Sequence, residues 1–323
     1  MTMTTDGVVR VEHLTKTFGP VLAVDDLSFE IGPGRVTGFL GPNGAGKTTT
    51  LRMLLGLVEP TSGHATIGGR RYRELPRPGR FVGAALEASS FHPGRTARDH
   101  LRVLAPQVGV PTQRCDEVLE LVGLADAANR RAGGFSLGMR QRLALAATLL
   151  GDPKVLLLDE PANGLDPQGI AWLRQLLRFL AAEGRTVLVS SHVLSEVQQT
   201  VDDVVIIAKG RLVHSSPIAG LAELTTRQVL VASPDSAALE RLVTGRWPEQ
   251  AEPAGAAGAF LVRDVDAAAV GAAAFAERIE LHQLATRDVG LEQIFLQLTG
   301  GEVGTGAGPT GDLAAPTTPG SAA

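Results

Sequence analysis

The octapeptide from position 41 to position 48 constrains this chain more than any other feature of its sequence. It reads GPNGAGKT and stands between a short apolar run, residues 35–40, and a segment with helical spacing, residues 48–57. Glycines in such a turn let backbone N–H groups converge on a phosphate, and the positive end of the following helix points at the same charge. The pattern predicts a phosphate-binding loop. A structural glycine turn is the alternative, and the lysine and threonine that end the motif argue against it.

The loop supplies most of the candidate ligands for a nucleotide. Lys47 can reach the β and γ phosphates with its ammonium group, and the hydroxyl of Thr48 can ligate Mg²⁺. A nucleoside triphosphate with Mg²⁺ is therefore the expected occupant. Its candidate ligands in this segment are Gly41, Pro42, Asn43, Gly44, Ala45, Gly46, Lys47, Thr48 and Thr49.

Two acidic residues follow a wholly apolar segment, residues 155–158. Asp159 and Glu160 stand where this predicted strand ends, and burying two carboxylates there without a metal or a partner would cost free energy. We expect Asp159 to hold the coordination shell of Mg²⁺ and Glu160 to polarise the water that attacks the γ phosphate. An acidic turn at a strand end is the alternative, and the phosphate loop in the same chain weakens it.

Strand and helix patterns alternate along the first two thirds of the chain. Two alternating apolar runs, residues 8–11 and 27–31, predict an antiparallel strand pair with a turn near Gly19. Further predicted strands at 35–40, 81–86, 154–158 and 186–190 are separated by helical segments at 48–57, 95–131, 140–150 and 170–182. This alternation predicts an α/β fold with a largely parallel sheet.

Three further motifs carry a resemblance to a known family. Residues 135–142, FSLGMRQR, lie ahead of Asp159 and resemble the signature sequence of ATP-binding-cassette (ABC) proteins. Residues 163–166, NGLD, are similar to the D-loop of that family, and His192 is similar to its switch histidine. The resemblance extends over about residues 8–217, with each motif in family order. It implies a P-loop ATPase of the ABC type, with a mostly parallel core sheet, an antiparallel β subdomain and a helical subdomain.

The resemblance also implies that two copies pair head to tail around ATP and Mg²⁺. Ser136 and Gly138 of one copy would close over the γ phosphate held by the other, with Asp166 also at the nucleotide and His192 acting in catalysis beside the γ phosphate. A serine hydroxyl and free amides at a helix start are good phosphate ligands. Taken alone, residues 135–142 fit an ordinary capped helix start equally well, and a single histidine is more often structural.

Departures from the family pattern concern an aromatic residue, a carboxylate and the signature itself. Phe18 stands where the family often has tyrosine, so the resemblance implies stacking on adenine; a core phenylalanine is the alternative. Glu87 replaces the usual glutamine, and its carboxylate can ligate Mg²⁺ or orient water, unless it is a solvated loop residue. The signature reads SLGM where SGGQ is commonest. The last two changes resemble the subgroup of bacitracin and daunorubicin efflux ATPases.

The domain organisation predicted from these patterns has three parts. Residues 1–217 form the ABC ATPase domain, with its helical subdomain at about 88–150. Residues 218–300 form a small α+β C-terminal domain, and their last stretch, 293–300, resembles the closing helix of many efflux ATPases; it could stabilise a dimer, contact a partner or simply pack. The tail at 301–323 is Gly, Pro, Thr and Ala with almost no large apolar side chain, which predicts disorder.

Composition and charge limit the partners and the location. The chain has 44% apolar and 20% charged residues and a formal net charge of -4, unlike strongly basic nucleic-acid binders, so no nucleic-acid partner is expected. Cys115 is the only cysteine, which excludes an intrachain disulfide and suits a reducing compartment. No export signal and no run of the roughly 20 apolar residues needed to cross a bilayer is evident. We expect a location at the cytoplasmic face of the cell membrane, on a separately encoded transmembrane permease.

These observations favour an enzyme over two other classes. The leading hypothesis is the ATP-hydrolysing subunit of an ABC transporter, by resemblance an exporter of a drug-like or antibiotic compound. A soluble ABC ATPase acting on ribosomes or DNA usually has two cassettes in one chain or a long coiled-coil insertion, and the sequence shows neither. A nucleotide sensor without catalysis would not need Glu160 or His192.

Overall fold

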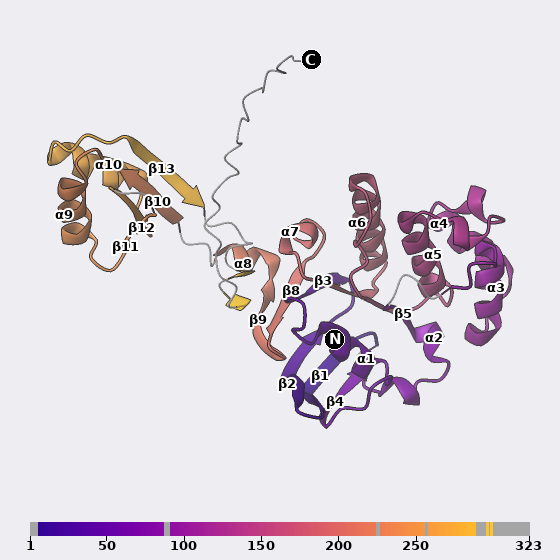
Figure 1. Ribbon diagram of the computed structural model, residues 1–323. Helices are drawn as coiled ribbons and strands as arrows, with labels where there is room; N and C mark the ends of the chain where they lie inside the picture. Colours follow the sequence, from indigo (N-terminus) through magenta and orange to yellow (C-terminus); the bar gives the residue numbers. More distant parts are fainter. Residues whose placement is uncertain are drawn as a thin grey trace, which may run out of the picture.

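The fold is described from a computed structural model of the chain. It describes residues 6–86, 91–223, 227–255, 258–288, 295–296 and 298–299. The predicted tail at 301–323 lies outside these residues. Figure 1 shows the first part of the chain as strands flanked by helices, with a smaller C-terminal unit beside them.

A six-stranded sheet forms the centre of the larger part. All neighbouring strands in it pair in parallel except the last pair, β8 and β9. In spatial order the strands are β5 (Val82–Ala85), β6 (Val155–Leu158), β7 (Thr186–Ser191), β3 (Arg35–Leu40), β8 (Asp203–Ala208) and β9 (Arg211–Pro217). The predicted strand at 81–86 is slightly shorter, because Phe81 is the last residue of helix α2 (Pro78–Phe81).

A second, three-stranded antiparallel sheet covers the phosphate loop region. It consists of β1 (Val9–Phe18), β2 (Val21–Ile31) and β4 (Ser62–Ile67), with β1 in the middle. The predicted turn near Gly19 joins β1 to β2. Both strands are longer than the alternating apolar runs, since their exposed outer ends continue the ladder to the pair Phe18 and Val21.

The helices begin where the sequence supplies caps. The side chains of Thr96, Ser136 and Asp166 each accept a backbone N–H in the first turn of their helix, satisfying a donor that the helix cannot. The longer helices are α1 (Lys47–Leu54), α3 (Ala97–Val108), α4 (Gln113–Leu121), α5 (Leu137–Leu149) and α6 (Pro167–Ala182), and the short ones are α7 (Leu194–Val197) and α8 (Ile218–Glu223). Single 3₁₀ turns occur at Tyr72–Glu74, Ala125–Ala127 and Ala132–Gly134.

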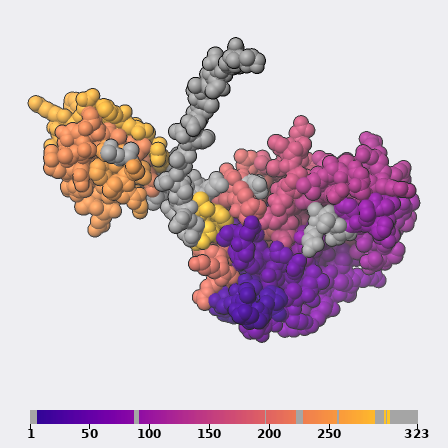
Figure 2. Space-filling model, viewed as in Figure 1, coloured from indigo at the N-terminus to yellow at the C-terminus, as the bar shows by residue number. Residues whose placement is uncertain are grey.

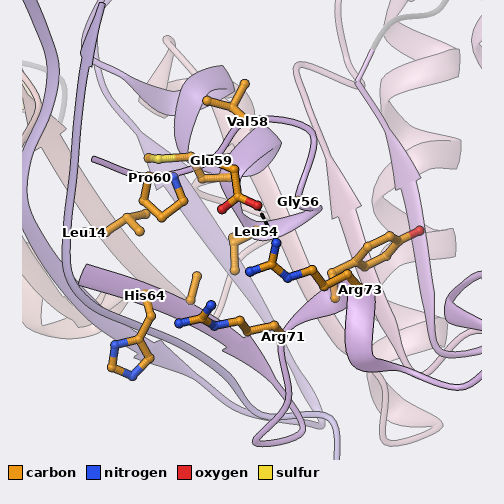
Figure 3. Close-up of a pocket in the computed structure, with 12 residues that line it drawn as sticks. Leu14, Leu54, Gly56, Val58, Glu59, Pro60, His64, Arg71 and Arg73 are labelled. Atoms are coloured by element: carbon orange, nitrogen blue, oxygen red, sulfur yellow. Dashed lines mark hydrogen bonds and ion pairs between the residues drawn. The ribbon is translucent and has the colours of Figure 1, made fainter. Parts of the chain in front are cut away.

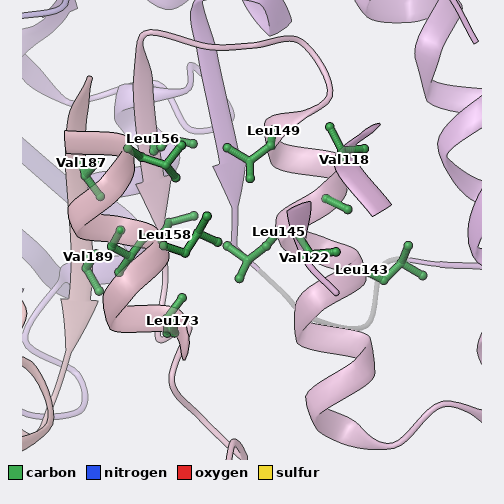
Figure 4. Close-up of a cluster of buried hydrophobic side chains, with 14 of the residues drawn as sticks. Val118, Val122, Leu143, Leu145, Leu149, Leu156, Leu158, Leu173, Val187 and Val189 are labelled. Carbon is green, nitrogen blue, oxygen red and sulfur yellow. The ribbon is translucent and has the colours of Figure 1, made fainter. Parts of the chain in front are cut away.

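Alternate residues of the central strands belong to two different hydrophobic clusters. In β6, Leu156 and Leu158 pack in one cluster with α4, α5 and α6, and Leu157 packs in the other with α1 and the antiparallel sheet. Figure 4 shows Leu156 and Leu158 lying between Val187 and Val189 of β7 and the leucines of α5. A strand buried on both faces must be apolar throughout, which is why the sequence of β6 does not alternate.

The C-terminal unit has the chain order of a split βαβ fold. Its elements are β10 (Arg227–Ala232), α9 (Ser236–Arg246), β11 (Ala251–Pro253), β12 (Ala259–Arg263), α10 (Ala267–Ala276) and β13 (Gln283–Asp288). The antiparallel sheet has the order β11-β12-β10-β13, which is the ferredoxin-like arrangement. The unit has its own core, including Val229, Phe260 and Val270, and Figure 2 shows it to one side of the larger part.

The chain beyond β13 returns to the larger part. Phe295 is 4% exposed and belongs to the cluster that contains α5 and α6, with Leu298 packed against it. Of the stretch at 293–300, only 295–296 and 298–299 are described, all as helix. No helix in the described part of the chain has both the length and the apolar character to cross a membrane.

Candidate nucleotide-binding and hydrolysis site

The phosphate loop joins the end of β3 to the start of α1, and two of its glycines have no room for a side chain. A Cβ on Gly41 would lie 2.4 Å from the carbonyl oxygen of Ile207. A Cβ on Gly46 would lie 2.6 Å from that of Ala23, and Gly46 has a φ of 103°. Space alone therefore demands glycine at position 41, and both space and backbone conformation demand it at position 46. Of the other predicted ligands in the loop, Pro42, Asn43 and Gly44 are exposed and Ala45 is buried.

Lys47, the first residue of α1, points back into the loop. Its Nζ lies 2.6 Å from the carbonyl oxygen of Gly41 and 3.5 Å from Oε1 of Glu160. Burial lowers the pKa of Lys47, while the charges of Glu160 and Asp159 act in the opposite direction. The ammonium group is thus held among carbonyl and carboxylate oxygens, where incoming phosphate oxygens would replace these partners.

Thr48, from the phosphate loop motif, and Asp159, from the acidic motif after β6, are in contact. The hydroxyl of Thr48 donates to Oδ2 of Asp159 over 2.7 Å, although the two residues lie on α1 and after β6. A hydroxyl and a carboxylate oxygen in contact are hard oxygen donors of the kind that Mg²⁺ prefers. The residues present therefore fit Mg²⁺. Thr49, the next predicted ligand, is half-buried on α1.

Glu160 is fixed by three contacts and by its backbone. Its φ is 48°, a left-handed conformation that is unfavourable for a non-glycine residue. Its N–H donates to Oγ of Ser190 over 2.9 Å, and its carboxylate meets His192, with Oε2 2.9 Å from Nδ1. With the contact to Lys47, the carboxylate lies between a cation and an imidazole. The structure thus brings together Lys47, Thr48, Asp159, Glu160 and His192.

Sequence reasoning missed Ser190, which lies at the centre of this cluster. Its hydroxyl donates to Oδ1 of Asp159 and accepts the backbone N–H of Glu160, so one side chain links the carboxylate of Asp159 to the backbone of Glu160. Ser190 is fully buried near the end of β7. A signal was present, because two serines end the otherwise apolar β7, the parallel neighbour of β6.

A second missed residue, Gln141, supports the segment after Glu160. It is 8% exposed on α5, and its Nε2 donates to the carbonyl oxygen of Pro161 over 3.2 Å. Because Gln141 is on the signature helix, it links that helix to the turn that carries Glu160. The sequence gives no clear signal for this role, because Gln141 stands between Arg140 and Arg142 in a polar stretch of the helix.

The signature residues lie on a separate, open surface. Ser136 caps α5, Asp166 caps α6, and both line a pocket of about 540 Å³ together with Gly138 and Gly164. None of the residues that line this pocket belongs to the phosphate loop. Ser136, Gly138 and Asp166 therefore lie together in one pocket, and this pocket does not include the phosphate loop.

Phe18 is at the exposed end of β1 and is not a core residue. Its ring is 47% exposed, and Nζ of Lys16 lies 4.8 Å from the ring centroid. Lys16 is itself held by the carbonyl oxygen of Glu59, to which its Nζ donates over 2.8 Å. Glu59 also lines a small cavity of about 40 Å³. Figure 3 shows Glu59 paired with Arg73 at the side of this cavity. That volume suits a water and not a nucleotide.

Glu87, the predicted catalytic and metal residue after β5, lies outside the described residues. The residues on either side of it are informative. Leu86 and Phe91 line a groove of about 590 Å³ between the two halves of the larger part, together with Arg52, Tyr72, His100 and Leu104. The two described residues that flank the segment 87–90 thus both line this groove.

Comparisons with known proteins identify the family to which a site of this kind belongs. A family model described as "ABC transporter" matches residues 24–163, and one described as a domain of unknown function (DUF8746) matches residues 226–292. The bacitracin transport ATP-binding protein BcrA of Bacillus licheniformis is 45% identical over 213 residues, which cover 65% of this chain and 70% of that protein. The Nod factor export ATP-binding protein I of Paraburkholderia xenovorans (strain LB400) is 35% identical over 305 residues, covering 92% and 99% of the two chains.

A solved structure of an ATP-binding subunit of an ABC transporter aligns with a TM-score of 0.61 at 27% identity, over 67% of this chain and 92% of that one. Both the predicted fold class and the predicted family are confirmed. With such identity over most of the matched proteins, this chain belongs to the ATP-binding subunits of ABC transporters and is an ATPase of that family.

Proposed function

We propose that this chain hydrolyses ATP with the cluster around Glu160, as one of two copies that drive a separate membrane permease. The observation that carries this proposal is the contact of Glu160 with both Lys47 and His192, next to the pair Thr48 and Asp159. A carboxylate in this position can accept a proton from the attacking water. His192 and Lys47 restrict its orientation.

ATP enters by displacing contacts that the loop makes with itself. The phosphates replace the carbonyl oxygens around Lys47, and the free amides of the loop donate to them. Thr48 and Asp159 would hold Mg²⁺, with Glu87 as a further carboxylate ligand proposed from the sequence. When bound, Mg²⁺ neutralises phosphate charge. Phe18 stacks on adenine with its exposed ring.

The second copy supplies the remaining phosphate ligands. Ser136 is exposed and Gly138 half-buried at the start of α5, in a pocket that contains no phosphate-loop residue. Donors at a helix start are useful only to an anion that reaches them. A second copy, placed head to tail, brings its own nucleotide to this surface, and Asp166 lies beside it.

The partner proposed for the groove near Glu87 is a helical, mainly apolar segment of a permease. The groove offers Leu55, Leu57, Leu86, Phe91 and Leu104, with Arg52 and Tyr72 as polar groups. An apolar groove with few polar groups fits an amphipathic helix. Such a complex would place this chain at the cytoplasmic face of the membrane. The name of one matched relative, for Nod factor export, supports export as the direction of transport, and that of another, for bacitracin transport, supports an antibiotic as the exported compound.

The substitution Glu160→Gln tests the catalytic assignment. We expect turnover to fall at least about a hundredfold, because the amide cannot accept a proton. ATP binding, measured by titration, should stay within about threefold of wild type, since the amide keeps the shape of the side chain. Glu183→Gln is the matched control, because the carboxylate of Glu183 is exposed and, among the described residues, forms its ion pair with Arg185. Unchanged hydrolysis in Glu160→Gln would refute the assignment.

A further inference from the structure

A leucine of the signature sequence packs onto a glycine of the D-loop within the same chain. A Cβ built on Gly164 would lie 2.0 Å from Cδ2 and 2.8 Å from Cγ of Leu137. Real Cβ atoms do not approach carbon so closely, so the side chain of Leu137 occupies the space that any residue other than glycine would need. Gly164 also has a φ of 74°, which allows the D-loop to turn beneath the leucine.

Leu137 is unlike the other leucines of its helix. Leu143, Leu145 and Leu149 of α5 are at most 3% exposed and belong to the main cluster, whereas Leu137 is 52% exposed. Its contact with Gly164 is therefore not part of the core. A large apolar side chain held half in solvent, against one particular glycine, indicates a specific contact between the start of α5 and the D-loop.

The contact lies between the groups that the second copy is proposed to meet. Leu137 stands between Ser136 and Gly138 in the sequence, and Gly164 precedes Asp166 by two residues. A Cβ on Gly138 would lie 3.5 Å from Cδ2 of Leu165, an ordinary van der Waals distance, so the two segments also lie side by side at this point. One turn along α5, the guanidinium of Arg142 lies 4.2 Å from the ring centroid of Trp172 on α6.

We infer that Leu137 and Gly164 form a knob-and-hole contact that holds the signature sequence and the D-loop in one fixed arrangement. Ser136, Gly138 and Asp166 are thereby presented to the second copy as a single surface. Leu137 and Gly164 are positioning residues, since neither carries a group that could react with ATP. The inference rests on the proposed association of two copies. It adds that the contact of Leu137 with Gly164 sets the geometry of the surface that each copy presents.

A double-mutant cycle tests the pair. In Gly164→Ala the new methyl group displaces Leu137, so we expect kcat to fall about fivefold to tenfold, whereas ATP affinity of the separate copy stays the same. Leu137→Ala should reduce kcat less, because the surface loosens without a clash. In the double variant the clash is gone and only the strain of an alanine at a φ of 74° remains, so kcat should rise above that of Gly164→Ala, toward that of Leu137→Ala. Leu137→Met, which can refill the space, should stay near wild type.

Two measurements separate this result from simpler causes. The four chains are also made with Glu160→Gln, and their ATP-dependent self-association is measured, where Gly164→Ala should weaken pairing and the double variant should restore it. Leu121→Ala is the control, because Leu121 is a half-exposed leucine that ends α4. If the two substitutions simply add, the effect of Gly164→Ala is backbone strain alone and the inference is wrong. If wild-type turnover occurs without any pairing, the proposed function itself is wrong.

Discussion

The nucleotide cluster and the signature surface differ in how complete they are within one chain. Around Asp159 and Glu160 every charged group has a partner, namely Lys47, Thr48, Ser190 or His192. At the signature surface, Ser136 and Asp166 use their side chains only to cap their own helices, and the pocket beside them is open. This difference indicates that the nucleotide cluster is preorganised within each copy, whereas the signature surface is arranged to associate with a second copy.

The largest effect should follow from the loss of a charge in the complete half. In Asp159→Asn the amide replaces the carboxylate that meets both Thr48 and Ser190, so we expect turnover to fall at least about a hundredfold. Steady-state hydrolysis at saturating ATP and Mg²⁺ measures this. Asp152→Asn is the control, because the exposed carboxylate of Asp152 pairs with Arg185 and Arg114 and not with the nucleotide cluster. Activity close to wild type would show that the cluster is not the catalytic centre.

Removing the hydroxyl of Ser190, which links the carboxylate of Asp159 to the backbone of Glu160, should have the next largest effect. Ser190→Ala leaves the N–H of Glu160 and Oδ1 of Asp159 without that partner, and we expect kcat to fall about tenfold with little change in KM. Ser191→Ala is a matched neighbour whose hydroxyl bonds to the backbone of Val193. Equal effects of the two substitutions would mean that Ser190 only packs.

An exposed aromatic residue should affect binding more than chemistry. Phe18→Ala removes the ring proposed to stack on adenine, so KM for ATP should rise about threefold to tenfold while kcat changes little. Phe18→Tyr keeps the ring and should bind ATP like wild type. Fluorescent-nucleotide titration measures both. If Phe18→Ala binds ATP as tightly as wild type, the stacking assignment is wrong.

The smallest expected effect is on stability as a function of pH. It concerns His100, which, unlike the charged groups of the nucleotide cluster, has a ring nitrogen that is unpaired within the described part of the chain. It is 8% exposed, and its Nδ1 has no hydrogen-bond partner among the described residues. Burial lowers the pKa of His100, and the charge of Arg95 lowers it further. Below the ordinary pKa of 6.5 the unfolded chain takes up a proton that the folded chain resists, so stability falls as the pH falls from 7 toward the lowered folded pKa.

Denaturant unfolding at a series of pH values checks this expectation. His100→Gln should make the loss of unfolding free energy on acidification smaller than in wild type. His282→Gln, at an exposed position of the C-terminal unit, should leave the pH dependence as it is. The same pH dependence in His100→Gln and wild type would show that His100 is not disfavoured in its charged form.

The sequence predicted most of the larger part because its signals are local. The strand at Arg35–Leu40 is correct to the residue, since a β-branched apolar run ends there at a glycine. The helix around Ile170 also agrees, apart from its first turn, which Pro167 and the cap Asp166 add. In the C-terminal unit, helix α9 (Ser236–Arg246) was missed because only Leu239 and Val243 mark its buried face.

The site shows the same limit. Motifs such as the phosphate loop contain their own chemistry, so their residues could be named in advance. Ser190 and Gln141 act through contacts with residues about 20 to 30 positions away, which only the parallel pairing of β6 with β7 and the packing of α5 produce. The contact between Leu137 and Gly164 is likewise invisible in sequence, because the two segments meet only after α5 and α6 have packed.

The central claim is that one nucleotide is enclosed by the phosphate loop of one copy and the signature helix of another. Sedimentation of the Glu160→Gln chain with and without ATP and Mg²⁺ tests it most directly, because slow hydrolysis preserves the closed state. We predict a monomer without nucleotide and a dimer with ATP and Mg²⁺. A chain that binds ATP but sediments as a monomer at every nucleotide concentration would contradict the claim.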